Sequence, residues 1–171
     1  MAEFKHAYNK TKQYEGGYAN VPNDRGGETY MGISRKYYPA WEGWKTVDKH
    51  KPLQHNEIIK DAQLDSLVMQ FYYYKFWSKL HGDYIESQCT ADLLYDYYVH
   101  SGMKAIKAVQ GIVGVTEDGI VGVRTLNAIN GYAGDLFLKL KAQRRQFLYD
   151  LSEKQSQRKF RKGWLARVDN F

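Results

Sequence analysis

The sequence has little of what would crosslink a small domain or carry it into a membrane. Its 171 residues include one cysteine, Cys89, which excludes an intramolecular disulfide and a cysteine-based zinc site. No apolar run approaches the roughly 18 residues that a membrane span requires, so no membrane insertion is expected. The first ten residues are charged and lack the apolar core of a signal peptide. We therefore expect synthesis in the cytoplasm without a signal peptide.

Several signatures of catalysis and cofactor binding are also absent. The sequence contains neither a phosphate-binding G-x-x-x-x-G-K-[ST] loop nor a serine nucleophile elbow. Its five histidines show no metal-ligand spacing, so the sequence predicts no metal site and no cofactor. The chain is long enough to bury a core without such support, and an aromatic content of 15% excludes a disordered chain.

Positive charge and tyrosine are abundant. Lys and Arg number 25 against 19 Asp and Glu, which gives a net charge of +6. This excess favours an anionic partner such as nucleic acid, anionic lipid or bacterial cell wall. The basic residues are spread along the chain, which argues against nucleic acid. Fifteen tyrosines and four tryptophans suit either a dense aromatic core or a surface that holds sugars or bases.

Helical periodicity covers most of the chain and predicts a mostly α fold. The turn-forming residues between 15 and 33 predict at most a small β-hairpin near the N-terminus. Asn56 is a plausible N-cap for the second helix. The helices are expected at 2–14, 56–79, 88–100, 103–112, 123–130 and 134–155.

The segment from Glu15 to Gly32 contains the acids of chemical interest. Glu15 is expected at the C-terminal end of a helix, where the helix dipole disfavours an ionised carboxylate and raises its pKa. Asp24 follows in a polar turn beside Arg25 and is expected to stay ionised, and the Thr29 hydroxyl is placed to orient a water molecule. Two carboxylates in opposite protonation states are what glycosidic bond hydrolysis requires. From the spacing alone, a surface acid and a turn residue are the simpler interpretation.

Three short motifs lie between residues 15 and 33: E-G-G-Y at 15–18, D-R-G-G-E-T at 24–29 and G-I at 32–33. Together they resemble the N-terminal signature of glycoside hydrolase family 108. Its members are peptidoglycan-degrading lysozymes of bacteria and phages, and some carry the label of secretion-activating proteins. The resemblance assigns the catalytic acid to Glu15 and implies a lysozyme-like helical fold. The order of Glu15, Asp24 and Thr29 is similar to the catalytic triad of phage lysozymes, although Thr29 is one residue nearer to Asp24 here.

The resemblance continues to the end of the chain. The later motifs are Y-D-Y at 95–97, H-S-G at 100–102, D-G-I-V-G-V-R-T at 118–125 and G-W-L-A-R-V at 163–168. The last two resemble a peptidoglycan-binding region. The resemblance therefore implies a lysozyme-like catalytic region over residues 1–105 and a helical peptidoglycan-binding-like region over 106–171, packed as one body.

The same motifs and the aromatic run at 71–77 supply candidates for substrate contact. That run covers every face of a helix, so part of it must be core and part must be exposed or line a cleft. Tyr74 and Trp77 are predicted at the cleft. The full set of predicted substrate-binding residues is Tyr18, Tyr30, Tyr74, Trp77, Asp96 and His100.

The sequence as a whole predicts a lysozyme that cleaves peptidoglycan between N-acetylmuramic acid and N-acetylglucosamine. Bacterial peptidoglycan is then the partner, and the site of action is the cell wall after release, by analogy with phage lysozymes through a holin-type pore. If Asp24 activates water, its carboxyl should lie roughly 6.5–9.5 Å from that of Glu15 and the product should be inverted. The alternative is a non-catalytic cell-wall-binding or secretion-accessory protein on the same fold.

Overall fold

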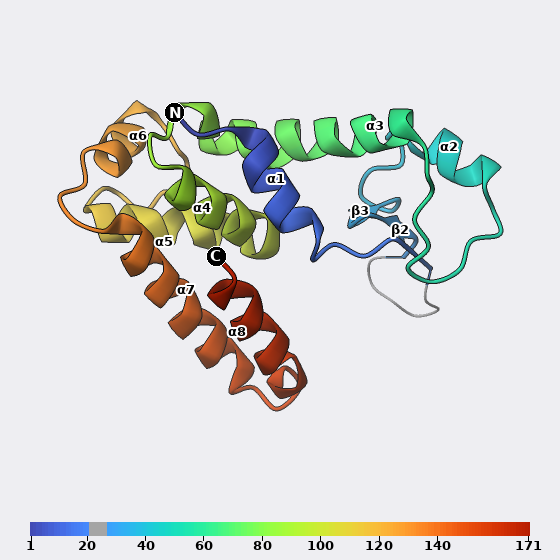
Figure 1. Cartoon of the computed structure of the whole chain (residues 1–171). Coiled ribbons are helices and arrows are strands. Elements are labelled where there is room, and N and C mark those ends of the chain that lie inside the picture. The colour runs from blue at the N-terminus through green and yellow to red at the C-terminus, as the bar shows by residue number, and fades with distance from the viewer. Residues whose placement is uncertain (21–26) are drawn as a thin grey trace. The chain divides into compact units, whose positions relative to one another are not determined.

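The computed structural model describes residues 1–20 and 27–171, and these form two compact units (Figure 1). One unit spans Thr11–Tyr73, and the other combines Met1–Lys10 with Tyr74–Phe171. Helices predominate and the β structure is one small sheet, so the predicted fold class is confirmed. In the described part of the chain, every helix is too short or too polar to cross a bilayer.

The unit of residues 11–73 is built on a three-stranded antiparallel sheet. Its strands are β1 (Tyr18–Ala19), β2 (Thr29–Tyr30) and β3 (Ile33–Ser34), in that order across the sheet. The turn between β2 and β3 consists of Met31 and Gly32, whose φ angles are 48° and 77°. Two left-handed residues in succession are typical of the tight turn that matches the twist of a hairpin.

Two helices complete this unit, α2 (Trp44–Lys49) and α3 (Ala62–Tyr72). The prediction of Asn56 as an N-cap is wrong. Asn56 has a φ of 64°, and its N–H donates to the carbonyl of Tyr18 in β1. The helix begins after Asp61, whose carboxylate accepts from the N–H of Leu64 at 2.8 Å. The polar segment before it therefore runs beside the sheet.

The second unit contains α1 (Phe4–Lys12) up to Lys10 and the remaining helices. Its longest members are α4 (Gln88–Ser101), α5 (Met103–Val113) and α7 (Leu136–Ser152), and α4 packs against both of the others. The remaining helices are α6 (Val123–Asn130) and α8 (Arg161–Asp169), and α8 lies along α7 (Figure 1). Short turns of π- or 3₁₀-helix occupy Tyr73–Trp77, Ser78–Leu80, Gly82–Tyr84 and Arg158–Phe160.

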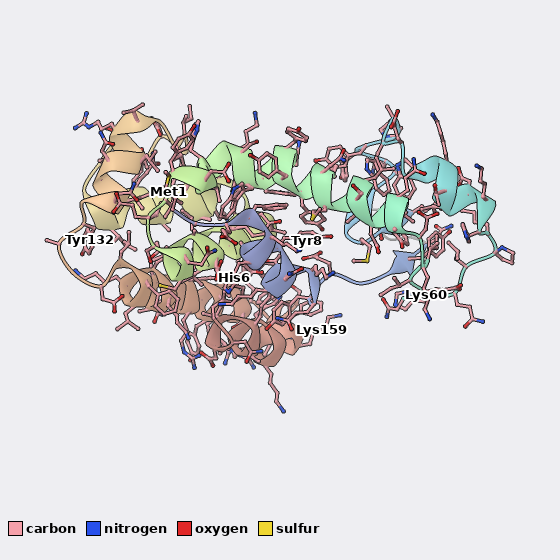
Figure 2. The ribbon with its side chains drawn as sticks, turned by 45° about the horizontal axis from the view of Figure 1, so that its top comes forward. Met1, His6, Tyr8, Lys60, Tyr132 and Lys159 are labelled. Atoms are coloured by element: carbon pink, nitrogen blue, oxygen red, sulfur yellow. The ribbon has the colours of Figure 1, made fainter. Side chains whose placement is uncertain are left out.

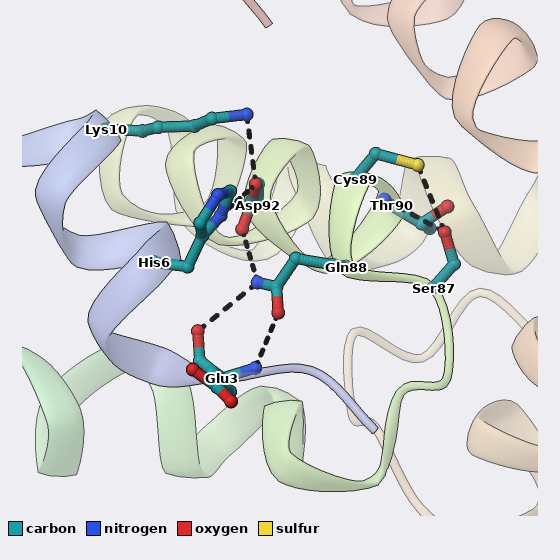
Figure 3. A network of polar contacts seen from close by, with 8 residues as sticks. All are labelled: Glu3, His6, Lys10, Ser87, Gln88, Cys89, Thr90 and Asp92. Atoms are coloured by element: carbon teal, nitrogen blue, oxygen red, sulfur yellow. Dashed lines mark hydrogen bonds and ion pairs between the residues drawn. The ribbon is translucent and has the colours of Figure 1, made fainter.

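A buried carboxylate joins α1 to α4. Asp92 has no exposed surface and accepts hydrogen bonds from Gln88 at 2.6 Å and from the His6 ring at 2.8 Å, while the Lys10 ammonium lies 3.1 Å away (Figure 3). Figure 2 shows His6 and Tyr8 projecting from the same short helix. Since a buried charge is costly unless it is paired, these contacts fix α1 on α4.

The D-G-x-x-G turn between α5 and α6 has a structural role. Gln110 is fully buried, and its side chain bonds Asp118, the backbone N–H of Gly119 and the carbonyl of Ile120. Gly119 has a φ of 80°, which suits glycine. One amide side chain thus holds the whole turn.

Candidate active site

Glu15 stands where the chain leaves α1 and enters the sheet. Its N–H donates to the carbonyl of Lys12 at 3.1 Å, one turn back. Of the two glycines that follow, Gly17 is required by a close approach of the backbone, whereas a Cβ on Gly16 would meet only a side-chain oxygen. A Cβ on Gly17 would lie 2.4 Å from the carbonyl oxygen of Glu57, and one on Gly16 would lie 2.9 Å from the Asn56 side chain. The E-G-G-Y motif therefore lets residues 56–57 run directly against the chain that follows Glu15.

The Glu15 carboxyl lies against the turn of the β2–β3 hairpin. A Cβ on Gly32 would lie 2.7 Å from Oε2 of Glu15 and 2.6 Å from the hydroxyl of Tyr72. The carboxyl and the hydroxyl therefore converge on the same side of this glycine. The turn is tied to the motif as well, because the N–H of Met31 donates to the carbonyl of Gly17 at 3.1 Å.

Tyr72 is a functional candidate that the sequence interpretation missed. It is buried, and its hydroxyl donates to the carbonyl of Met31 at 2.8 Å. Leu64, Val68 and Tyr72 recur every four residues on the buried face of α3. This four-residue spacing in the sequence could have distinguished Tyr72 from the other residues of the aromatic run. The side chain of Glu15, by contrast, remains partly exposed. Such a carboxyl, which rests on a fixed turn and is partly exposed, can give a proton to a bound substrate.

A network of charges stiffens the same sheet. Arg35 pairs with Glu28 at 2.6 Å and with Asp48 at 2.6 Å, and Lys51 pairs with both acids. Hydrogen bonds from Arg35 and Lys51 hold the pKa of Asp48 below its usual value. Burial, followed by the hydrogen bond to Glu28, raises the pKa of Tyr18. The strand that follows Gly17 is thereby fixed by side-chain as well as backbone contacts.

If Glu15 is the catalytic acid that the family resemblance implies, Gly32→Ala should impair activity because its methyl group would meet both Glu15 and Tyr72. A displacement of a catalytic group by about 1 Å can cost on the order of 10²-fold in rate. The matched control is Gly114→Ala: Gly114 has a φ of 74°, close to the 77° of Gly32, but its Cβ would meet nothing within 4 Å. Both variants carry similar backbone strain, so equal rates of peptidoglycan hydrolysis in the two would refute this role of Gly32.

The other predicted catalytic residues are placed as follows. Asp24 lies outside the described residues, so its distance from Glu15 stays a prediction. Thr29 is partly exposed and lies on β2, where it pairs with Ala19 and Ser34. It precedes by two residues the turn that contacts Glu15.

Both predicted tyrosines of the sheet are buried. Tyr18 pairs with Tyr30 across β1 and β2, which brings these two residues together with the hairpin turn. Tyr30 has no exposed surface, and its hydroxyl accepts from the N–H of Ile59 at 3.2 Å. In place of a sugar contact, Tyr30 thus joins the sheet to the segment before α3.

The predicted pair from the aromatic run divides between core and surface. Trp77 is fully buried against Phe4 and Tyr95, and its ring N–H donates to Asp83 at 2.8 Å. The predicted cleft position of Trp77 is therefore wrong, because its entire indole is packed or hydrogen-bonded. Tyr74 is 68% exposed and stays a prediction.

Asp96 is fully enclosed, which corrects its prediction as a sugar-binding residue. Its carboxylate contacts Arg144 of α7 at 2.6 Å and Arg167 of α8 at 2.8 Å. Burial raises the pKa of Asp96, but the hydrogen bond from Arg167 and the two positive charges outweigh burial and lower it. Asp96 therefore links three helices as a buried anion. Arg144, which is also fully buried, belongs to this link.

His100 lies one helical turn beyond Asp96 and is held neutral. Its ring makes an edge contact with Trp164 of α8, with 6.0 Å between centroids. Burial, with the charges of Arg167 and Arg144, lowers its pKa to about 4. These surroundings give His100 a packing role between α4 and α8, and the prediction that it binds substrate stays untested.

The half-buried His100 gives stability a pH dependence. Its pKa of about 4 in the folded chain is below the value of about 6.5 in an unfolded one. The unfolded state therefore binds a proton at a higher pH than the folded state does. We expect the free energy of unfolding to decrease as the pH is lowered from about 6.5 to about 4. Urea unfolding at several pH values should show a weaker dependence in His100→Gln. The exposed His50 provides the control His50→Gln, which should keep the wild-type dependence.

Within residues 1–20 and 27–171, no three His, Cys, Asp or Glu side chains are grouped so that they could hold a metal ion. The site described above consists of a carboxyl, a phenol and a hairpin turn.

Comparison with known proteins gave matches over nearly the whole chain. The sequence model described as "Glycosyl hydrolase 108" matches residues 8–102, and the one described as "Predicted Peptidoglycan domain" matches residues 104–169. No curated protein matches the sequence. Among solved structures, that of SagA from Brucella abortus is 29% identical with a TM-score of 0.67. The alignment covers 98% of this chain and 90% of that one.

Proposed function

Since this chain belongs to the glycosyl hydrolase 108 family, we propose that it is a lysozyme that hydrolyses the glycan strands of bacterial peptidoglycan. The second match supports peptidoglycan as the partner and a function related to the cell wall. The observation that carries the proposed catalytic activity is the contact of Glu15 with the hairpin turn. That contact holds a partly exposed carboxyl at the position which the family motif assigns to the catalytic acid.

The proposed reaction is cleavage between N-acetylmuramic acid and N-acetylglucosamine. Glu15 gives its proton to the glycosidic oxygen as the bond to the anomeric carbon breaks, and a water molecule attacks that carbon. Asp24 accepts the proton of this water or stabilises the positive charge that develops on the sugar, and Thr29 orients the water. With a water between the two carboxyls, the product is inverted.

The hydrogen bond from Tyr72 to Met31 supports this assignment of roles. It fixes the turn against which Glu15 rests, so the acid keeps one orientation without being buried. A general acid must be held within hydrogen-bond reach of the leaving oxygen, which a mobile surface carboxylate would not satisfy.

The proposed substrate also indicates where the protein acts. We propose that the chain acts on the cell wall after release from the cytoplasm through a holin-type pore. The region of residues 104–169 then holds the polymer while the region of Glu15 cuts it.

The direct test is the clearing of a suspension of purified peptidoglycan by the full chain. Loss of turbidity with release of new reducing ends is expected. Binding to the sediment without any new reducing end would favour the non-catalytic cell-wall-binding alternative and overturn the proposal.

A further inference from the structure

A cavity of about 430 Å³ lies in the unit of residues 1–10 and 74–171, outside the unit that carries Glu15. One wall is the segment 85–90 at the start of α4, and the other is the segment 129–137 between α6 and α7. Figure 2 shows Tyr132 on this second segment. The volume is within the roughly 300–1,000 Å³ of pockets that hold small ligands.

The two walls are joined by hydrogen bonds and are therefore preformed. The side-chain oxygen of Asn130 accepts from the N–H of Glu86 at 3.0 Å, and its amide donates to the carbonyl of Tyr84 at 2.8 Å. One side chain from α6 thus fixes the loop that leads into α4. A ligand that enters this cavity does not have to order the loop first.

The lining combines an apolar floor with a polar rim. Ile85, Ile129 and Leu136 are at most 6% exposed and form the floor. Tyr132 at the rim is partly exposed and offers both an aromatic face and a hydroxyl. A purely apolar ligand would leave this rim unsatisfied, and a purely polar one would leave the floor empty.

The charges around the cavity favour a neutral ligand. The first turns of α4 and α7 both line the cavity. Ser87 accepts a hydrogen bond from the N–H of Thr90, and Asp135 accepts one from the N–H of Leu138. The first N–H groups of each helix have no acceptor within the helix and disfavour a cation. Glu86 and Asp135 add negative charge to a lining that has no lysine or arginine, while the Lys139 ammonium lies 5.4 Å from the centroid of the Tyr132 ring. These charges balance in part, which favours neither an anion nor a cation.

We propose that this cavity binds an N-acetylated amino sugar of the peptidoglycan glycan strand, an inference that rests on the proposed function. The acetamido carbonyl accepts from the N–H groups at the helix starts, and its methyl group packs on the apolar floor. The sugar hydroxyls donate to Glu86 and Asp135, and the pyranose ring lies on Tyr132. Each part of the lining then has a complement in one neutral molecule.

The identity of the ligand is also supported by the place of the cavity in the sequence. The whole wall from 129 to 137 lies within the stretch that matches the peptidoglycan domain. The opposite wall, residues 85–90, lies within the glycosyl hydrolase match. A sugar held here would engage both regions of the chain at once.

The single cysteine of the chain provides a direct readout. Cys89 is exposed at the rim, with its sulfur 3.2 Å from the Ser87 hydroxyl (Figure 3). We suggest measuring the rate at which a disulfide reagent modifies this thiol in the full-length Glu15→Gln chain, so that no probe is consumed. N,N′,N″-triacetylchitotriose should slow the modification in a saturable way. Cellotriose, which lacks the acetamido groups, should have no effect.

A matched pair of variants tests the aromatic wall. Tyr132→Ala should weaken the protection by triacetylchitotriose by about threefold to tenfold, as expected for the loss of one ring contact. In Tyr149→Ala, which changes an exposed tyrosine outside the cavity, triacetylchitotriose should protect Cys89 as strongly as in the parent chain. No protection of Cys89 in the parent chain, equal protection by cellotriose, or unchanged protection in Tyr132→Ala would overturn the inference.

Failure of this inference and failure of the proposed function are separable. If Cys89 is not protected but the wild-type chain releases reducing ends from peptidoglycan, the cavity assignment alone is wrong. If Cys89 is protected but no reducing ends appear, the cavity binds the sugar and the hydrolase proposal is wrong.

Discussion

Glu15→Gln is expected to abolish the hydrolysis of peptidoglycan while the fold is kept. The amide has the shape of the carboxyl but no proton to give, so the glycosidic oxygen would leave as an unprotonated alkoxide. Loss of a general acid costs typically 10²–10⁴-fold in rate. The measurement is the rate of release of reducing ends from purified peptidoglycan, with circular dichroism as the check on folding.

The control for this variant is Glu42→Gln, at an exposed glutamate of the same unit before α2. It makes the identical chemical change and should leave the rate unchanged. Hydrolysis by a folded Glu15→Gln chain at the rate of Glu42→Gln would remove Glu15 from the mechanism.

Asp96→Asn is expected to cause a large loss of stability. Removal of one member of a buried ion pair typically costs about 3–5 kcal/mol, because the partner charge stays buried without compensation. Arg144 has no exposed surface, and Arg167 is 12% exposed on its side chain, so neither can turn to water freely. Urea unfolding followed by tryptophan fluorescence measures the change.

An exposed ion pair between α7 and α8 offers a matched comparison. Asp169 pairs with Arg145, but these side chains are 53% and 49% exposed. Asp169→Asn should therefore change the free energy of unfolding by about 1 kcal/mol or less. If both variants lost the same amount, the buried network would not be what joins α4 to α7 and α8.

The local part of the site was accessible from the sequence. A helix that ends before Gly16 and Gly17 placed Glu15 at its exit, and the turn chemistry around Gly32 indicated a hairpin. These features depend on residues close in sequence. The small helix α2 was not predicted, since its six residues are too few to show a clear period.

The sequence did not show which residues of the aromatic run at 71–77 are buried and which are exposed. The four-residue spacing of α3 holds up to Tyr72, but the helix then changes to π geometry over Tyr73–Trp77. The change shifts every later side chain relative to the α-helical period. This is why the prediction for Trp77 was wrong, whereas Tyr72 still lies within the regular α-helical spacing.

Asp96 illustrates what the sequence did not reveal. Its partners follow 48 and 71 residues later, and only the packing of α7 and α8 on α4 brings them together. Before that packing is known, an acid between two tyrosines is equally consistent with a sugar contact and a buried ion pair. The division of the chain between residues 105 and 106 also stays a prediction.

The most direct test of the central claim is the identity of the sugar at the new reducing ends. Purified peptidoglycan is digested with the full-length chain, reduced with borohydride, hydrolysed and analysed by mass spectrometry. If Glu15 drives hydrolysis between N-acetylmuramic acid and N-acetylglucosamine, reduced muramic acid appears with the wild type and is absent with Glu15→Gln. Reduced glucosamine in its place, or reduced muramic acid in equal amount with Glu15→Gln, would contradict the account.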